Sequence, residues 1–217
     1  MNKNYQYILF DLDGTLTDPK EGITKSVQFA LAKLGIDEPD CDNLVKFIGP
    51  PLAHSFIEYY GFDEAKAKLA VEKYREYFAV TGIFENEVYP GIKTMLESLQ
   101  KAGKSICLAT SKPTVFAEKI LEHFGLAEYF NAVAGSNLDG SRVRKSEVIQ
   151  FVLESMKVGD RSKAVMIGDR EHDIIGAREA GIDSIGVTFG YGRREELVGA
   201  KATAIADNPK ELLGLLV

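Results

Sequence analysis

Two aspartates flank a single leucine at the end of an apolar run near the start of the chain. Asp11 and Asp13 lie in the segment ILFDLDGTLTD, residues 8–18, and Gly-Thr follows directly. Two carboxylates this close repel each other, and an ordinary turn needs only one Asp or Asn. A turn, a calcium loop and a catalytic or metal site are the candidate interpretations. Spacing excludes the calcium loop, because its sixth position would need Gly and is Leu16, and its twelfth would need Glu and is Gly22.

Two later apolar runs also end in polar residues that could join such a site. Thr110 ends the run SICLAT and is followed by Ser111, while Asp169 ends the run KAVMIGD, with Asp173 shortly after. Each has an ordinary alternative, since hydroxyls and acids are common at helix N-termini, where the same groups would also hold a phosphate. In an open parallel sheet, ligands bind beyond the carboxyl ends of the strands. The shared placement therefore favours one assembled site.

Short apolar runs that alternate with helical patterns position these residues. The expected strands cover residues 5–11, 105–110, 131–136, 163–169, 183–188 and 202–207. Apolar residues at helical spacing recur between them, over residues 92–99, 117–124 and 148–156. Continuous apolar strands that alternate with amphipathic helices predict a parallel sheet covered on both faces. We therefore expect an α/β protein with a Rossmann-like, three-layer α/β/α core.

One long connection interrupts the alternation. Residues 18–84 separate the first strand from the next helix of the core, whereas a βα loop usually takes roughly 2–6 residues. The segment carries two apolar stripes at helical spacing, and Gly49 and Pro50 predict a rigid, non-helical turn between them. We expect an α-helical domain over 18–84, inserted into a catalytic core of residues 1–17 and 85–217.

The composition narrows the classes of partner. The 217-residue chain has a formal charge of -6 and scattered basic residues, whereas a nucleic-acid surface needs a basic stripe, so we expect no nucleic-acid partner. No apolar run is long enough to span a bilayer and the N-terminus lacks a signal-peptide core, so we expect no membrane partner. Cys41 and Cys107 cannot form a staple framework, and reduced thiols favour a cytoplasmic location.

In order and spacing, these residues resemble the motifs of the haloacid dehalogenase superfamily of aspartate-dependent hydrolases. DLDGTLTD resembles its first motif, LATS its second, Lys145 in RVRKSEVI its third and GDREHD its fourth. The resemblance covers nearly the whole chain, and the helical insertion is similar to the small cap of the phosphoglycolate-phosphatase-like branch. It implies a phosphoric monoester hydrolase that acts on a small-molecule phosphate ester. We expect the protein to be a monomer or a homodimer.

The resemblance also implies roles for the acids. Asp11 would be the nucleophile that attacks phosphorus and forms an aspartyl-phosphate, and Asp13 would be the general acid and later the base. Asp169, the Asp11 carboxylate and the Asp13 backbone carbonyl would bind Mg²⁺, the implied cofactor. Asp173 would orient Lys145 or metal-bound water. These carboxylates would tolerate one another because a divalent ion offsets their repulsion.

The groups implied to hold the substrate come from both predicted domains. Thr110 and Ser111 would bind the transferring phosphoryl group together with Lys145, and the cap loop at Gly49 and Pro50 would reach toward the substrate.

The third motif leaves an alternative open. In the commoner pattern of this motif Pro follows the Lys, whereas here Ser146 follows Lys145. Arg142 and Arg144 therefore compete for the role of Lys145.

These features predict a Mg²⁺-dependent phosphatase for a small phosphomonoester such as phosphoglycolate or a nucleoside monophosphate. Dehalogenases of the superfamily typically lack an acid at the Asp13 position, so its presence favours a phosphate ester, whose leaving oxygen needs a proton. A hexose-phosphate mutase similar to β-phosphoglucomutase and an inorganic pyrophosphatase would use the same core acids. A phospho-acceptor module similar to a response-regulator receiver also places acids at strand ends, but such modules are shorter and lack a helical insertion of this size.

Overall fold

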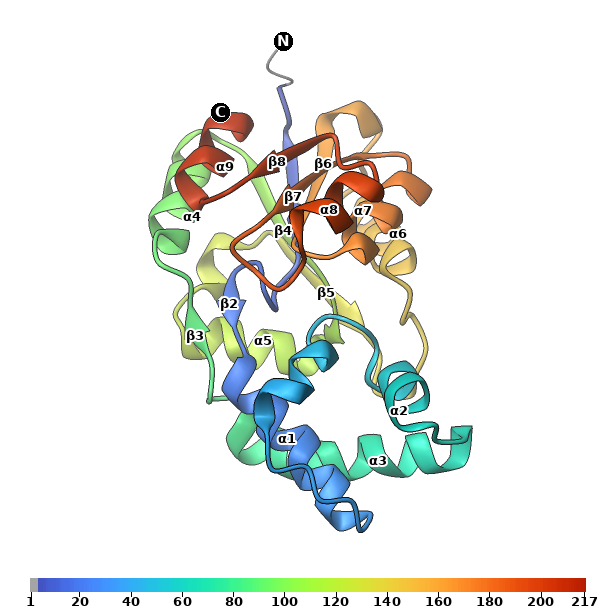
Figure 1. The fold of residues 1–217 in the computed structure, drawn as a ribbon. Helices are drawn as coiled ribbons and strands as arrows, with labels where there is room; N and C mark the ends of the chain where they lie inside the picture. Colours follow the sequence, from blue (N-terminus) through green and yellow to red (C-terminus); the bar gives the residue numbers. More distant parts are fainter. Residues whose placement is uncertain (1–3) are drawn as a thin grey trace. The chain divides into compact units, whose positions relative to one another are not determined.

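The computed structural model describes residues 4–217, and the chain divides into two compact units. One unit combines the described residues up to Asp18 with Val88–Val217, and the other is Pro19–Glu87. The helical insertion predicted from the sequence, residues 18–84, has limits within a few residues of the second unit. Figure 1 shows the chain coloured along its length.

The first unit is built on a six-stranded parallel sheet, as the continuous apolar runs predict. In spatial order its strands are β5 (Ala132–Ser136), β4 (Ser105–Pro113), β1 (Tyr7–Phe10), β6 (Ala164–Gly168), β7 (Asp183–Val187) and β8 (Ala204–Ala206). The register places Ile8 of β1 opposite Ile106 of β4 on one side and Val165 of β6 on the other. The predicted fold class is confirmed, and each predicted run contributes a strand.

Helices cover both faces of this sheet (Figure 1). They are α4 (Ile92–Lys101), α5 (Thr114–His123), α6 (Lys145–Ser155), α7 (Glu171–Glu179), α8 (Arg194–Gly199) and α9 (Pro209–Leu216), with short 3-10 turns at η3 (Ala127–Tyr129) and η4 (Arg161–Lys163). Helices α4 and α5 precede strands that lie successively farther to one side of β1, and α6, α7 and α8 connect strands in the opposite direction. Right-handed crossovers therefore place the two groups on opposite faces.

Apolar side chains from α6 and α7 fill one face of the sheet. Val148, Ile149, Val152 and Leu153 of α6 are buried, a spacing that turns one side of the helix toward the strands. They pack in one cluster with strand residues such as Leu9. Truncating one of these large side chains to Ala is expected to cost roughly 2–5 kcal/mol. This packing fixes where α6 begins, and hence where Lys145 lies.

The second unit is helical. It contains α1 (Lys20–Lys33), the 3-10 helix η1 (Cys41–Phe47), α2 (Leu52–Tyr60), α3 (Glu64–Tyr77) and the π-helical turn η2 (Phe78–Gly82). The turn predicted at Gly49 and Pro50 separates η1 from α2, and Gly49 has a φ of 103°. A Cβ on Gly22 of α1 would lie 1.9 Å from the Gly82 carbonyl oxygen, so only glycine allows α1 to approach η2 this closely.

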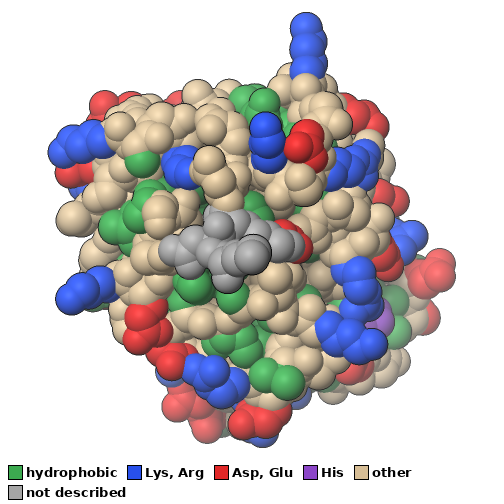
Figure 2. Space-filling view, turned by 90° about the horizontal axis from the view of Figure 1, so that it is seen from above, with side chains coloured by type: hydrophobic (Ala, Val, Ile, Leu, Met, Phe, Trp, Pro, Cys, Tyr) green, Lys and Arg blue, Asp and Glu red, His purple; other side chains and the backbone are tan. Residues whose placement is uncertain are grey.

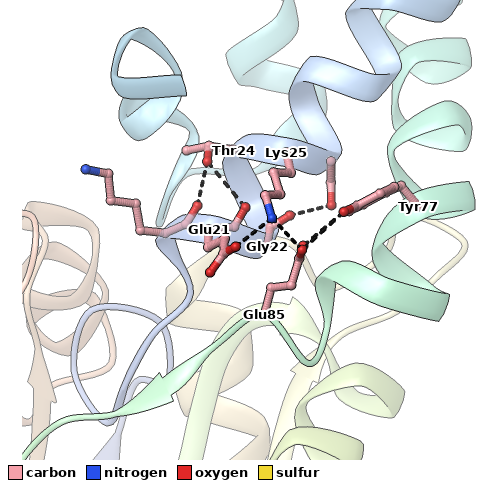
Figure 3. A network of polar contacts seen from close by, with 8 residues as sticks. Glu21, Gly22, Thr24, Lys25, Tyr77 and Glu85 are labelled. Atoms are coloured by element: carbon pink, nitrogen blue, oxygen red, sulfur yellow. Dashed lines mark hydrogen bonds and ion pairs between the residues drawn. The ribbon is translucent and has the colours of Figure 1, made fainter. Parts of the chain in front are cut away.

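A polar network ties the start of α1 to the segment that ends the helical unit (Figure 3). The Lys25 ammonium lies between two carboxylates, 2.5 Å from Glu21 and 2.7 Å from Glu85. The Tyr77 hydroxyl contacts both oxygens of Glu85 at 3.2 Å, and the Gly22 N–H donates to the Glu85 carbonyl at 2.9 Å. Each charged group of the network thus has an opposite charge or a donor beside it.

The segments that connect the two units pair as a short two-stranded sheet, β2 (Thr17–Asp18) with β3 (Glu87–Val88). On the face seen in Figure 2, basic and acidic side chains are interspersed. Within residues 4–217, no helix combines the length and the apolar character that crossing a membrane would require.

Candidate active site

The residues singled out in the core gather at one edge of the six-stranded sheet. Asp11 follows β1, Asp169 follows β6, and Thr110 lies in the last part of β4, where the pairing with β5 shifts register between Ala109 and Pro113. Because the strands are parallel and β1 lies between β4 and β6, their carboxyl ends meet. The sheet therefore brings together segments that are far apart in the sequence.

Backbone groups close the turn that follows β1. The Leu12 carbonyl accepts hydrogen bonds from Leu16 N at 2.9 Å and Thr17 N at 3.1 Å, and the Gly14 N–H donates to the Thr17 carbonyl at 2.8 Å. Gly14 has a φ of 80°, and a Cβ there would lie 2.3 Å from Asp169 Oδ2. Glycine therefore allows both the left-handed turn and the close approach of the Asp169 carboxylate. The turn leaves the two flanking aspartate side chains to other partners.

The side chain of Lys145, the first residue of α6, contacts two of the acids, Asp11 and Asp173. Its ammonium lies 2.9 Å from Asp11 Oδ1 and 2.8 Å from Asp173 Oδ1, and donates to the Ala109 carbonyl at 3.1 Å. A Cβ on Gly176 of α7 would lie 2.8 Å from Lys145 Cγ, so this glycine makes room for the lysine stem. Burial lowers the pKa of Lys145, but the two carboxylates outweigh it and the net shift is upward. The ammonium therefore stays charged.

The two arginines that compete with Lys145 in the sequence have other partners. Arg142 Nε donates to the Gly135 carbonyl at 2.8 Å, and its guanidinium carbon lies 4.1 Å from the centre of the Phe151 ring. Arg144 pairs with Glu179 at 3.2 Å. The structure thus brings Lys145, and neither arginine, to Asp11.

Asp169 is buried, and its two carboxylate oxygens differ in their hydrogen bonding. Its Oδ2 accepts a hydrogen bond from the Tyr191 backbone N–H at 2.7 Å, and its Oδ1 has no hydrogen-bond partner within the described part of the chain. Cβ atoms on Gly190 and Gly192 would lie 2.6 Å from Asp169 Cβ and 1.7 Å from its carbonyl oxygen. The loop after β7 can therefore wrap the acid only because two glycines flank Tyr191. Burial, and then the charges of Asp173 and Asp11, raise the pKa of Asp169 well above its usual value.

Three buried carboxylates form a compact set. Ligand atoms from Asp11, Asp169 and Asp173 all lie within 4.8 Å of one another. Burial, opposed by Lys145 and reinforced by the charge of Asp11, raises the pKa of Asp173 to about 6. Asp173 Oδ2 also accepts from Arg170 N at 3.1 Å at the start of α7, so the capping role considered for this residue exists beside its contact with Lys145. Hard divalent cations prefer such oxygen ligands.

The Asp13 carboxylate faces a different cation. Its Oδ2 lies 2.9 Å from the Lys112 ammonium, and both side chains are buried. No hydrogen-bond partner for its Oδ1 is found in the residues that the structure describes. Burial raises the pKa of Asp13, the nearby Lys112 offsets part of that rise, and the charge of Asp11 adds to it. The net shift is upward, toward a carboxyl that holds a proton more readily than an exposed aspartate.

Thr110 and Ser111 do not cap the helix that follows them. The N-cap of α5 is Pro113, which provides no side-chain hydrogen bond, so the capping alternative is wrong. Thr110 is buried, and its Oγ1 accepts from Lys112 N at 3.3 Å, while Ser111 is half-buried and its carbonyl accepts from Ser136 Oγ at 2.8 Å. The substrate residues predicted in the helical insertion, Gly49 and Pro50, belong to the other unit and are half-buried in its loop. Their predicted contact with substrate stays a prediction.

Two contributors to the site were absent from the sequence analysis. Lys112 shows one usable signal, a charged residue two positions beyond Thr110 in a segment that pairs with a buried strand. Tyr191 contributes through its backbone N–H, which every residue but proline has, so only the flanking Gly190 and Gly192 mark the position.

The fold and site define a class of protein: an α/β protein with acids and a lysine gathered at the carboxyl edge of a parallel sheet. Residues 8–187 match the family described as haloacid dehalogenase-like hydrolase. The chain belongs to this family.

The chain is also similar in sequence to individual proteins over most of its length. A "5'-nucleotidase" of Pseudomonas aeruginosa is 54% identical over 193 residues, covering 89% of this chain and 87% of the relative. The "Tyrosine-protein kinase PtkA" of Mycobacterium tuberculosis is 36% identical, over 97% of this chain and 73% of the relative. A "Phosphoglycolate phosphatase" of Vibrio parahaemolyticus is 30% identical, over 97% of this chain and 96% of the relative.

A solved structure agrees with the fold throughout. The crystal structure of "a predicted phosphatase from Clostridium acetobutylicum" superposes with a TM-score of 0.95, is 52% identical and covers 97% of each chain. With these relatives, the chain is a phosphatase of the haloacid dehalogenase-like family, a phosphoric monoester hydrolase.

Proposed function

We propose that the chain is a Mg²⁺-dependent phosphatase that hydrolyses a small phosphomonoester through an aspartyl-phosphate on Asp11. The observation that carries the proposal is the buried group of Asp11, Asp169 and Asp173 within 4.8 Å, with the Lys145 ammonium between Asp11 and Asp173. An anionic nucleophile can approach an anionic ester only where cations offset the repulsion.

Asp11 is the nucleophile. Lys145 holds its Oδ1 at 2.9 Å, which fixes the carboxylate next to the place where a phosphoryl group would bind. A carboxylate oxygen of Asp11 forms a bond to phosphorus as the bond from phosphorus to the ester oxygen breaks. The resulting acyl phosphate splits one hard hydrolysis into two easier displacements.

Asp13 moves the protons. In the first step its carboxyl gives a proton to the leaving oxygen, so that the alcohol leaves neutral. In the second step its carboxylate takes a proton from the attacking water, the bond from phosphorus to Asp11 breaks, and phosphate leaves. The raised pKa of Asp13 supports the first, protonated state.

The residues of the site fit a divalent cation. With Asp11, Asp13, Asp169 and Asp173 all ionised, the ammonium groups of Lys112 and Lys145 leave two formal negative charges, and one remains when Asp13 holds a proton. Asp169 Oδ1 is a buried acceptor with no hydrogen-bond partner among residues 4–217. Asp169 and Asp11 would hold Mg²⁺ with the Asp13 backbone carbonyl, and Asp173 would lie beside them. When bound, Mg²⁺ supplies positive charge that neutralises the phosphoryl oxygens and orients them.

The phosphoryl oxygens are bound by the remaining polar groups. Thr110 and Ser111 offer hydroxyl donors at the end of β4, and Lys145 offers an ammonium. Phosphoryl transfer asks mainly for positioning and for neutralisation of charge, which these groups supply.

The substrate is a small phosphomonoester of the phosphoglycolate or nucleoside monophosphate type. The relatives named 5'-nucleotidase and phosphoglycolate phosphatase support these two classes. The helical unit serves as the cap, and its loop at Gly49 and Pro50 contributes contacts to the substrate. The insertion of the helical unit, Pro19–Glu87, into the core directly after β2 supports its assignment as a cap.

A panel of metabolite phosphates tests the proposal. Phosphoglycolate, nucleoside monophosphates, hexose phosphates and pyrophosphate are each incubated with the protein in Mg²⁺ or EDTA, and free phosphate and isomerised sugar phosphate are both measured. The proposal expects Mg²⁺-dependent phosphate release from a phosphomonoester. Isomerised sugar phosphate without free phosphate would indicate a mutase, and turnover of pyrophosphate alone would indicate a pyrophosphatase.

A further inference from the structure

Lys112 is a buried charge that the four motifs of the family resemblance do not include. Its ammonium lies 2.9 Å from Asp13 Oδ2, with only 5% of the lysine side chain and 11% of the aspartate side chain exposed. An exposed ion pair contributes little, but burying two charges has a large desolvation cost that only good geometry repays. So specific a contact with the proposed general acid calls for a functional explanation.

The fold holds Lys112 in place from the neighbouring strand. A Cβ on Gly135 of β5 would lie 2.0 Å from the Lys112 carbonyl oxygen, so the two backbones touch. The Lys112 N–H points to Thr110 Oγ1 at 3.3 Å, and Ser136 Oγ donates to the carbonyl of Ser111 at 2.8 Å. The irregular end of β4 is therefore anchored on both sides of the lysine.

We propose that Lys112 is a positioning residue that decides which oxygen of Asp13 carries the catalytic proton. The inference rests on the proposed role of Asp13 as general acid. An ammonium has three donors and no acceptor, so it can contact only an oxygen that offers a lone pair. The carbonyl oxygen of a protonated carboxyl accepts from a cation more strongly than its hydroxyl oxygen does, so the contact at Asp13 Oδ2 favours Oδ1 as the oxygen that carries the proton.

Oδ1 is the oxygen suited to this task. Among residues 4–217 it has no hydrogen-bond partner, so a proton there is not committed to another protein acceptor. In the first step the bond from phosphorus to the ester oxygen breaks, its electron pair goes to that oxygen, and the proton on Oδ1 moves there. In the second step Oδ1 takes a proton from water, and Lys112 keeps all of its own protons throughout.

The leaving group provides the test. Lys112→Met and wild type are compared on p-nitrophenyl phosphate, whose leaving group departs without a proton, and on an alkyl phosphate from the substrate panel, whose leaving group needs one. We expect the variant to lose about 10²-fold in kcat/KM on the alkyl ester, the lower end of what a general acid contributes. On the aryl ester we expect a loss of less than about 10-fold.

Two further variants separate positioning from general damage. Lys112→Arg keeps a group with donors only and is expected to retain the wild-type ratio of the two substrates, whatever its absolute rate. Lys112→Gln adds an acceptor that can meet a proton on Oδ2, so it is expected to shift the ratio as Met does, and it replaces Met if that variant does not fold. Lys119→Met, at an exposed position of α5, is the matched control and is expected to change neither rate.

Equal losses on the two esters in Lys112→Met, or no loss on the alkyl ester, would overturn the inference. So would a loss of the same size when Lys112→Met is added to Asp13→Asn, because no carboxyl proton is then left to position. These outcomes are distinct from a failure of the proposed function, in which wild type itself would release no phosphate from any ester.

Discussion

Two charged clusters, one in each unit, differ in how their charges are balanced. In the helical unit, Lys25 lies between Glu21 and Glu85, and its side chain is 38% exposed. In the core unit, Lys145 lies between Asp11 and Asp173, and its side chain is 4% exposed. Both lysines bridge two acids.

The difference lies in what remains unsatisfied. Water reaches the helical network, and the Tyr77 hydroxyl also contacts Glu85, so its excess negative charge is solvated. The core cluster adds Asp13, which pairs with Lys112, and Asp169, whose Oδ1 is buried with no hydrogen-bond partner among residues 4–217. A buried surplus of negative charge is costly unless something neutralises it. The core cluster is therefore arranged for a ligand, whereas the helical network is complete as it stands.

Removing one acid from each cluster gives the largest expected contrast. Asp11→Asn is expected to lower phosphatase turnover by at least about 10⁴-fold, because a neutral amide cannot attack phosphorus. Glu21→Gln removes one of the two acids beside Lys25 and is expected to leave kcat unchanged. Steady-state rates at saturating Mg²⁺ measure both, with melting curves to show that each variant folds. Substantial turnover by Asp11→Asn would refute its assignment as nucleophile.

Stability against pH is the second contrast. The pKa of Asp173 rises from 3.8 to about 6 on folding without metal, so the folded state binds the proton more tightly. Protonation of Asp173 therefore stabilises the folded state by up to about 3 kcal/mol. This stabilisation is complete below about pH 4 and is lost as pH rises through about 6.

The matched comparison is Asp173→Asn, which keeps an acceptor for Arg170 N. Urea titrations in EDTA are expected to show wild type losing stability relative to this variant as pH rises over that window, and Mg²⁺ is expected to reduce the loss. If wild type instead gained stability relative to Asp173→Asn with rising pH, the surplus of charge in the core cluster would be disproved.

Two glycines with the same backbone conformation provide the third contrast. Gly14 has a φ of 80° and Gly35 a φ of 78°, but a Cβ on Gly14 would meet Asp169, whereas no described residue lies within 4 Å of a Cβ on Gly35. Alanine at either position bears similar backbone strain, so Gly14→Ala is expected to be more destabilising than Gly35→Ala by about 2 kcal/mol. Urea denaturation measures the difference. Equal costs would mean that the close approach of Gly14 to Asp169 is unimportant.

The smallest effect is expected in the helical network itself. Lys25→Met removes an exposed ammonium from two acids and is expected to lower the melting temperature by a few degrees at most, without changing the affinity for Mg²⁺. Its effect is expected to fade in high salt, as exposed ion pairs are screened. A large loss of stability that persists in high salt would show that the network is not the solvated structure described above.

The sequence was sufficient for the sheet and for the acids at its edge. Continuous apolar runs identify buried parallel strands, and Asp11 and Asp169 each directly follow such a run, so strand order alone brings them together. Their helix-cap and turn alternatives could be weighed only with coordinates, because the turn after β1 is closed by backbone groups.

Lys112 could not be placed in the same way. The direction of its side chain depends on the register shift at the end of β4 and on close contact with Gly135, neither of which has a spacing signature in the sequence. The choice between Lys145 and the two arginines, Arg142 and Arg144, depended on where α6 begins and on the room left by Gly176. Tertiary contacts, rather than residue type, decide these positions.

Calorimetric titration of Mg²⁺ into metal-free protein tests the central claim most directly, using wild type, Asp169→Asn and Lys25→Met. The account predicts saturable binding at a single site in wild type and Lys25→Met, and loss of that binding in Asp169→Asn. Unchanged binding by Asp169→Asn, or no binding by wild type, would contradict it.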